Sequence, residues 1–171
     1  QVRETLIPLF YWMIECEVAE SMAKTPERPN FDVMERELVD ELDTCVSAGA
    51  GDQNYRWLFQ QRMKLLCQRS SLQLIQTSGL TMVKSVIDLL QQLLALRDVP
   101  EGEAFNDRRA GCMYALLDYY RERGLQNMAM RYVHRLVDVH YQSNHFTEAG
   151  FALQVHVDHL KFTDEKLPPL T

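Results

Sequence analysis

The sequence predicts an all-α protein, an α-solenoid or antiparallel helical-repeat array of about seven helices. Its composition is 46% hydrophobic and 25% charged, with seven Gly and six Pro, and it is richer in long helix formers such as Leu, Gln, Glu and Met than in strand formers. Apolar residues recur at steps of three and four along most of the 171 residues, separated by short polar breaks. Short connections favour antiparallel neighbours stacked in order.

The first predicted helix covers residues 6–22 and is apolar over most of its circumference. Pro8 should lie in its first turn or kink it, because proline lacks the backbone N–H that an interior position donates. The first two turns show no polar stripe, since their apolar residues are Leu6, Ile7, Leu9, Phe10, Tyr11, Trp12, Met13 and Ile14. This pattern suits a helix buried between neighbours, and we expect self-association wherever one side stays uncovered.

The second predicted helix begins at an Asn30 N-cap and is acidic outside its apolar stripe. The stripe consists of Phe31, Met34, Leu38, Leu42 and Val46, and the acidic set consists of Asp32, Glu35, Glu37, Asp40, Glu41 and Asp43. We interpret the acidic set as a solvated face. Gly49 and Gly51 should end this helix, and Asp52 should cap the next. No third glycine or Lys-Ser/Thr pair follows and no strand precedes, so the glycines do not indicate a phosphate loop.

Five more helices follow, and the clearest loop is residues 98–107, DVPEGEAFND. The predicted helices cover residues 54–68, 80–97, 108–124, 126–142 and 144–160, with Gly124 ending the fifth and Asn144 capping the seventh. In the seventh, the small residues Ala149 and Gly150 should let the preceding helix approach closely. The last hairpin is similar to a tetratricopeptide unit, but the 34-residue period of such repeats does not recur upstream.

Charge and cysteine usage exclude several classes of function. The net charge of −6 argues against nucleic-acid and anionic-membrane binding, which need a basic face. No unbroken apolar run reaches the roughly 18 residues of a membrane span, so we predict no transmembrane segment. The cysteines at 16, 45, 67 and 112 form no CxxC pair and no cluster with His. We expect reduced, mostly buried thiols in a cytoplasmic protein.

A search for chemistry finds no catalytic, cofactor-binding or metal-binding residues. His156 and His159 form an HxxH that lacks the HExxH spacing and the glutamate base of a metalloprotease, so we expect one buried and one exposed histidine. His134 and His140 lie too far apart around a helix to share a ligand. Ser70 and the other serines lack a strand-turn-helix context. The sequence therefore predicts no enzymatic activity for this chain by itself.

Four blocks of sequence together resemble one family. They read RETLIPLFYWMIECE, VMERELVDELDTCVSAGAGDQNYRWLF, LLALRDV and MAMRYVHRLVDVHYQSNHFTEAGFALQVHVDHLKFTDEKL, and their order and spacing resemble the DOCK (dedicator of cytokinesis) proteins. Gly150 and Phe162 depart from the family pattern, where a second alanine and a tryptophan are usual. The resemblance implies the end of an armadillo-like helical scaffold over 1–98, a loop over 99–107, and helical hairpins over 108–171 leading into the first lobe of the catalytic region.

This resemblance implies a guanine-nucleotide exchange factor that activates a Rho-family GTPase, with Rac expected, in cytoskeletal signalling. The exchange site is expected outside this chain, which starts at Gln1 and which we interpret as a segment of a longer protein. A homodimer, an ELMO-type adaptor bound elsewhere in the parent, and a cytoplasmic location with recruitment to the plasma membrane through other domains are further expectations. The alternative is a free-standing helical-repeat adaptor that binds a peptide or a partner helix.

Overall fold

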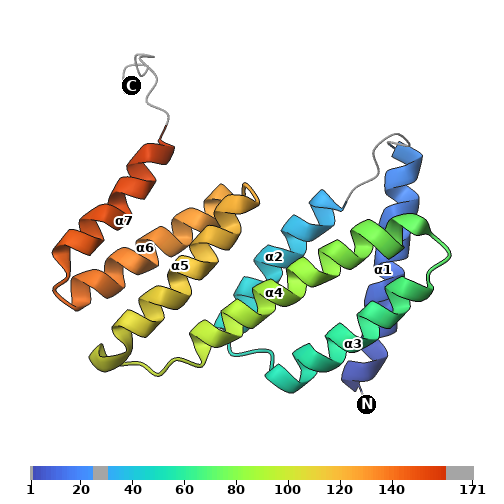
Figure 1. Ribbon diagram of the computed structural model, residues 1–171, viewed down its shortest axis with the longest axis horizontal. Helices are drawn as coiled ribbons and strands as arrows, with labels where there is room; N and C mark the ends of the chain where they lie inside the picture. The colour runs from blue at the N-terminus through green and yellow to red at the C-terminus, as the bar shows by residue number, and fades with distance from the viewer. Residues whose placement is uncertain (1, 25–30, 161–171) are drawn as a thin grey trace, which may run out of the picture. The chain divides into compact units, whose positions relative to one another are not determined.

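The computed structural model describes residues 2–24 and 31–160, and this part of the chain is helical throughout, without a strand (Figure 1). Its helices are α1 (Val2–Lys24), α2 (Asp32–Ser47), α3 (Gln53–Arg69), α4 (Leu80–Arg97), α5 (Asn106–Glu122), α6 (Gln126–Gln142) and α7 (Phe146–His159), with a π-helical turn (Ile75–Gly79) and a 3-10 turn (Glu103–Phe105). The predicted all-α helical-repeat class is confirmed. The chain divides into two compact units, Gln1–Pro100 and Glu101–Thr171, and the division falls in the predicted loop.

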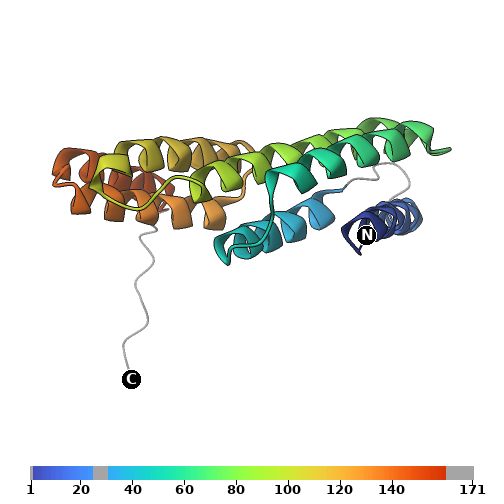
Figure 2. The ribbon, with the colours of Figure 1, turned by 90° about the horizontal axis from the view of Figure 1, so that it is seen from below.

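In the first unit, helices from successive hairpins pack against each other. α1 packs on α3 and α2 packs on α4, while α3 also packs on α4. Figure 2 shows α3 and α4 in one layer of this unit and α1 and α2 in the other. The predicted stacking of each helix on the next therefore holds for α3 and α4, whereas α1 and α2 each pack on the helix two positions along the chain. Contacts between equivalent helices of successive hairpins are what build a solenoid.

One apolar stripe from each helix forms the core of this unit. One cluster of buried residues consists of Ile7, Ile14 and Val18 from α1, Phe31 and Met34 at the start of α2, Phe59, Met63 and Cys67 from α3, and Ile75, Met82, Val83, Val86 and Ile87 from the fourth helical segment. Their steps of three, four and seven place each set on one side of its helix. The stripe on α1 and the stripe on α3 therefore bring these two helices into contact. Asp43 of α2 is also buried, so the prediction that the whole acidic set of this helix is solvated is wrong.

The helix over Ile75–Arg97 is, within the part of the chain that the structure describes, the one long and apolar enough to cross a membrane by length and composition. Lys84 and Asp88 interrupt its apolar run, so the sequence did not indicate a membrane span here. Half of the apolar window is buried inside the protein, where α2 and α3 pack against it. This burial is typical of a core helix in a helical array.

The ends of the helices confirm some of the predicted caps. The Asp52 carboxylate accepts a hydrogen bond from the Tyr55 N–H at 2.7 Å and so caps α3 as predicted. Gly49 and Gly124 adopt positive φ angles of 91° and 67° just after α2 and α5, as predicted for C-terminal caps. The predicted Asn30 cap lies outside the described residues.

Other predicted boundaries are wrong. Asn144 does not cap α7; with φ 60° it ends α6, because the next N–H, that of His145, closes a 2.8 Å bond to the carbonyl of His140. α1 begins at Val2, so Pro8 lies inside the helix and not in its first turn. Helical conformation also starts before residue 80, because the π-helical turn over Ile75–Gly79 leads directly into α4.

The second unit is an antiparallel three-helix array. α5 packs on α6 and α6 packs on α7, so here neighbours are stacked in the predicted order (Figure 1). The aromatic rings of Tyr120 and Tyr132, both fully buried, lie 5.4 Å apart between α5 and α6. Ala149 is buried, as expected for a close contact with α6. Gly150 is not part of that contact, because a Cβ atom built on it would meet nothing within 4 Å.

Candidate functional site

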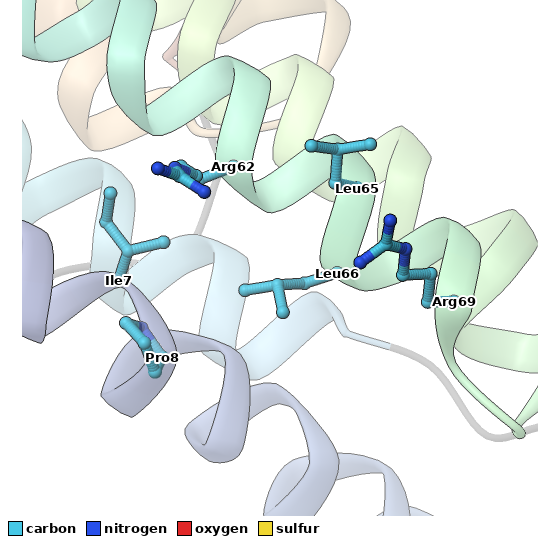
Figure 3. Close-up of a pocket in the computed structure, with 6 residues that line it drawn as sticks. All are labelled: Ile7, Pro8, Arg62, Leu65, Leu66 and Arg69. Atoms are coloured by element: carbon cyan, nitrogen blue, oxygen red, sulfur yellow. The ribbon is translucent and has the colours of Figure 1, made fainter.

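A groove with a cavity of about 260 Å³ lies between α1 and α3 (Figure 3). Its lining residues are Ile7 and Pro8 from α1 and Arg62, Leu65, Leu66 and Arg69 from α3, and we call it the α1–α3 groove. Positions 62, 65, 66 and 69 follow the i, i+3, i+4, i+7 spacing that places side chains on one face of a helix. These four residues therefore lie on one side of α3, with the two leucines between the two arginines along the helix.

The groove has an apolar floor and a cationic rim. Ile7 is only 2% exposed, and Leu66 is half-buried and points toward α1, whereas Arg62 and Arg69 are exposed (Figure 3). Neither arginine has an ion pair or a hydrogen bond with any residue that the structure describes. Both guanidinium groups lie at the protein surface, where an external anion can approach them.

α3 is basic although the chain as a whole is acidic. Its residues Gln53–Arg69 include Arg56, Arg62, Lys64 and Arg69 but neither Asp nor Glu, while the net charge of the chain is −6. The Arg56 guanidinium donates to the Gln53 and Gln91 side chains at 2.9 and 3.3 Å. Of these four cations, Arg62 and Arg69 line the groove.

Beneath the groove, aromatic rings form part of the contact between α1 and α3. The Phe10 and Phe59 rings meet edge to face with centroids 5.4 Å apart. Burial raises the pKa of the Cys67 thiol, and burial also raises the pKa of the Tyr11 hydroxyl. Both groups are therefore neutral at pH 7.

The opposite face of α1 is apolar and exposed. Leu6, Leu9, Trp12 and Met13 are each 50–61% exposed, whereas Ile7 and Ile14 are buried. The sequence predicted a helix that is apolar all round; the structure covers one side of it with α3 and leaves the other uncovered.

The glycine turn after α2 has a structural role. The Arg97 guanidinium, at the end of α4, donates to the carbonyl oxygens of Ala50 and Gly51 at 2.7 and 3.0 Å. Gly51 has φ 88°, and a Cβ atom there would lie 3.4 Å from a methyl group of Leu94. The turn therefore presents carbonyl groups to a cation, which is the reverse of a loop that cradles phosphate with N–H groups.

The histidines do not converge on a metal. His156 is half-buried and its ring meets that of His134 edge to face at 4.9 Å, while the side chain of His159 lies outside the described residues. His140 is buried, with its Nε2 atom 3.3 Å from the Tyr114 hydroxyl. No group of three His, Cys, Asp or Glu suited to a metal ion occurs in residues 2–24 and 31–160.

The expected burial of most cysteines is wrong. Cys67 is buried, but Cys16 and Cys45 are exposed and Cys112 is half-buried. Cys16 lies on the uncovered side of α1, and Cys45 lies near the end of α2. The prediction followed the general tendency of free cysteine to be buried, whereas the packing of α1 and α2 leaves Cys16 and Cys45 outside the core.

Comparison with known proteins identifies the family. Residues 1–62 match the family model described as the dedicator of cytokinesis (DOCK) TPR region. Over 98% of its length the chain is 33% identical to dedicator of cytokinesis protein 3 of Homo sapiens, and over 97% it is 31% identical to dedicator of cytokinesis protein 4 of Homo sapiens. The chain belongs to the DOCK family. It spans about 8% of the length of these DOCK relatives.

The family match bears on the groove and on the predicted scaffold. Ile7, Pro8 and Arg62 fall inside the matched DOCK region, and the other groove residues follow directly after it. The family description names a TPR region where the sequence predicted an armadillo-like scaffold, and both terms denote stacked antiparallel helix pairs. Sequence reasoning missed the groove; the absence of acidic residues from Gln53–Arg69 was the signal that could have indicated it.

Proposed function

We propose that this chain is a scaffold and interaction segment of a DOCK-type guanine-nucleotide exchange factor that activates a Rho-family GTPase, with Rac the expected member, in cytoskeletal signalling. The observation that carries the proposal is the alignment of nearly the whole chain with two DOCK proteins. The composition of the α1–α3 groove, apolar side chains beside two arginines, supports a binding role. Nucleotide exchange is assigned to other parts of the parent protein.

The expected partners follow from the same proposal. The GTPase is bound through other parts of the parent, and an ELMO-type adaptor is also bound elsewhere. The parent acts in the cytoplasm, with recruitment to the plasma membrane through other domains. A homodimer is proposed, and the uncovered apolar face of α1, formed by Leu6, Leu9, Trp12 and Met13, supports self-association of this chain.

A fluorescent-nucleotide release assay tests the proposal with two samples. Rac loaded with a fluorescent GDP analogue is mixed with this chain alone and, separately, with the longer parent protein. We expect release at the intrinsic rate with the chain and accelerated release with the parent. Acceleration by the chain alone would contradict the assignment of exchange to other regions, and a parent inactive on Rac and on other Rho-family GTPases would contradict the exchange function.

A second candidate function is a helical-repeat adaptor that binds a peptide or partner helix without any exchange activity in the parent. The observation that favours it is the α1–α3 groove, with the exposed arginines Arg62 and Arg69 in its lining. The release assay separates the two functions, because an adaptor predicts no acceleration with either sample. Peptide binding by the groove is compatible with both.

A further inference from the structure

The α1–α3 groove has the size of a side-chain pocket. Its volume of about 260 Å³ lies below the roughly 300–1,000 Å³ of pockets that enclose small molecules and cofactors. Ile7, Leu65 and Leu66 provide the apolar surface that an anchoring side chain of a peptide requires (Figure 3). The occupant that this volume fits is one apolar residue of a longer segment, with the rest of the segment lying along the surface.

The two arginines define the charge and the length of that segment. Arg62 and Arg69 are seven positions apart, which is about 10 Å along a helix axis at 1.5 Å per residue. Both lie on the groove face of α3, one on either side of Leu66 (Figure 3). Guanidinium groups pair with carboxylates through two parallel hydrogen bonds. A segment with two carboxylates about 10 Å apart would satisfy both.

A partner helix can place two carboxylates and an apolar side chain at the spacing that the groove requires. Acidic residues at i and i+7 of a partner helix have the same axial separation as the arginines, and a residue at i+3 or i+4 lies between them on the same face. Amphipathic helices commonly bind in hydrophobic grooves between other helices. A nucleic acid would need a longer basic surface, and α2, in the same unit, carries six acidic residues against the single Arg36.

We infer that the α1–α3 groove binds an acidic amphipathic helix of a partner protein, with carboxylates seven residues apart on Arg62 and Arg69 and an apolar residue between them over Leu66. An acidic helix complements α3 although the whole chain is acidic, because α3 itself contains no Asp or Glu. The inference does not depend on nucleotide exchange by the parent.

Fluorescence anisotropy with designed peptides tests the inference. The probe is a labelled, alanine-based helical peptide of about 16 residues, long enough to be partly helical, with two glutamates seven residues apart and a leucine between them. Controls are a peptide of the same composition with the glutamates on opposite faces, and one with the leucine replaced by glutamine. We expect saturable binding of the first peptide and a dissociation constant at least about tenfold higher for each control peptide. Salt should also weaken binding of the first peptide, because the arginines are exposed and their charges are screened.

Charge reversal on the protein identifies the groove as the binding site. R62E combined with R69E should weaken binding of the glutamate peptide at least about tenfold and favour a peptide with lysines in the same two positions. The matched control is K64E, which reverses an exposed cation of α3 outside the cavity lining and should leave binding nearly unchanged. Circular dichroism verifies that each variant is folded.

Three outcomes would overturn the inference. One is that the chain without substitutions does not bind the glutamate peptide at concentrations up to about 1 mM. Another is equal weakening by K64E and by the double reversal, which would indicate a general effect of charge. The third is a dimer of the peptide-free chain that the double reversal dissociates, because the groove would then be occupied by a second copy.

Discussion

Enlarging the side chain at two adjacent positions of α7, Ala149 and Gly150, should change the stability of the protein in opposite directions. Ala149 is 6% exposed and faces α6, so Ala149→Leu adds three carbon atoms to a closed contact. Overpacking of this kind costs about 1–3 kcal/mol. Gly150 is exposed inside the same helix, and an added Cβ atom would meet nothing within 4 Å. Gly150→Ala should therefore stabilise the protein by about 0.5–1 kcal/mol, because alanine loses less backbone entropy on folding.

The assay is urea denaturation followed by far-UV circular dichroism. Both tryptophans, Trp12 and Trp57, belong to the first unit, so their fluorescence reports on Gln1–Pro100, whereas α7 belongs to the second unit. If the units unfold separately, the two variants should shift the dichroism transition and leave the tryptophan transition in place.

The result that would refute this reasoning is a common sign for both variants. A destabilising Gly150→Ala would mean that residue 150 faces α6, and a neutral Ala149→Leu would mean that residue 149 faces solvent. Either result would require a different rotation of α7 about its axis. A change in the denaturant slope instead of the midpoint would indicate a change in the denatured state.

Three further outcomes are expected. The chain should self-associate at micromolar concentrations through the uncovered side of α1, and Leu9→Glu combined with Trp12→Lys should make it monomeric by light scattering; a monomeric unmodified chain would contradict this. A thiol reagent at pH 8 should label Cys16 rapidly and Cys67 only after unfolding, because Cys67 is buried and its pKa is raised; equal labelling rates measured by mass spectrometry would disagree. Asp52→Ala should cost about 1 kcal/mol in urea denaturation through loss of the α3 cap, and an unchanged midpoint would show that water replaces the carboxylate.

Several features of this protein depend on local interactions, and the sequence predicted them. The helical class follows from apolar residues at steps of three and four, and the Asp52 cap needs only a carboxylate three residues before an N–H group. Gly49 and Gly124 end helices because glycine alone adopts positive φ without strain. Asn144 also adopts a positive φ angle, which asparagine does less readily than glycine. The sequence therefore predicted a cap at the start of α7, whereas Asn144 ends α6.

The family resemblance was also visible in the sequence, because the order and spacing of the four blocks are properties of the chain and not of its packing. The matches to DOCK proteins 3 and 4 over nearly the whole chain confirm that resemblance. The absence of a phosphate loop was argued from spacing, and the Arg97 bonds to the turn carbonyls supply a structural reason for the glycines there.

Other features were decided by which helices meet. The apolar first helix could be covered on any side, and only its packing on α3 separates buried Ile7 from exposed Leu9. The α1–α3 groove combines residues more than fifty positions apart in the chain, so no local pattern could indicate that Pro8 and Arg69 line one cavity. The sequence by itself determined where helices form and end, because those events depend on neighbouring residues. The tertiary structure decided which faces remain open, because that depends on contacts between distant segments.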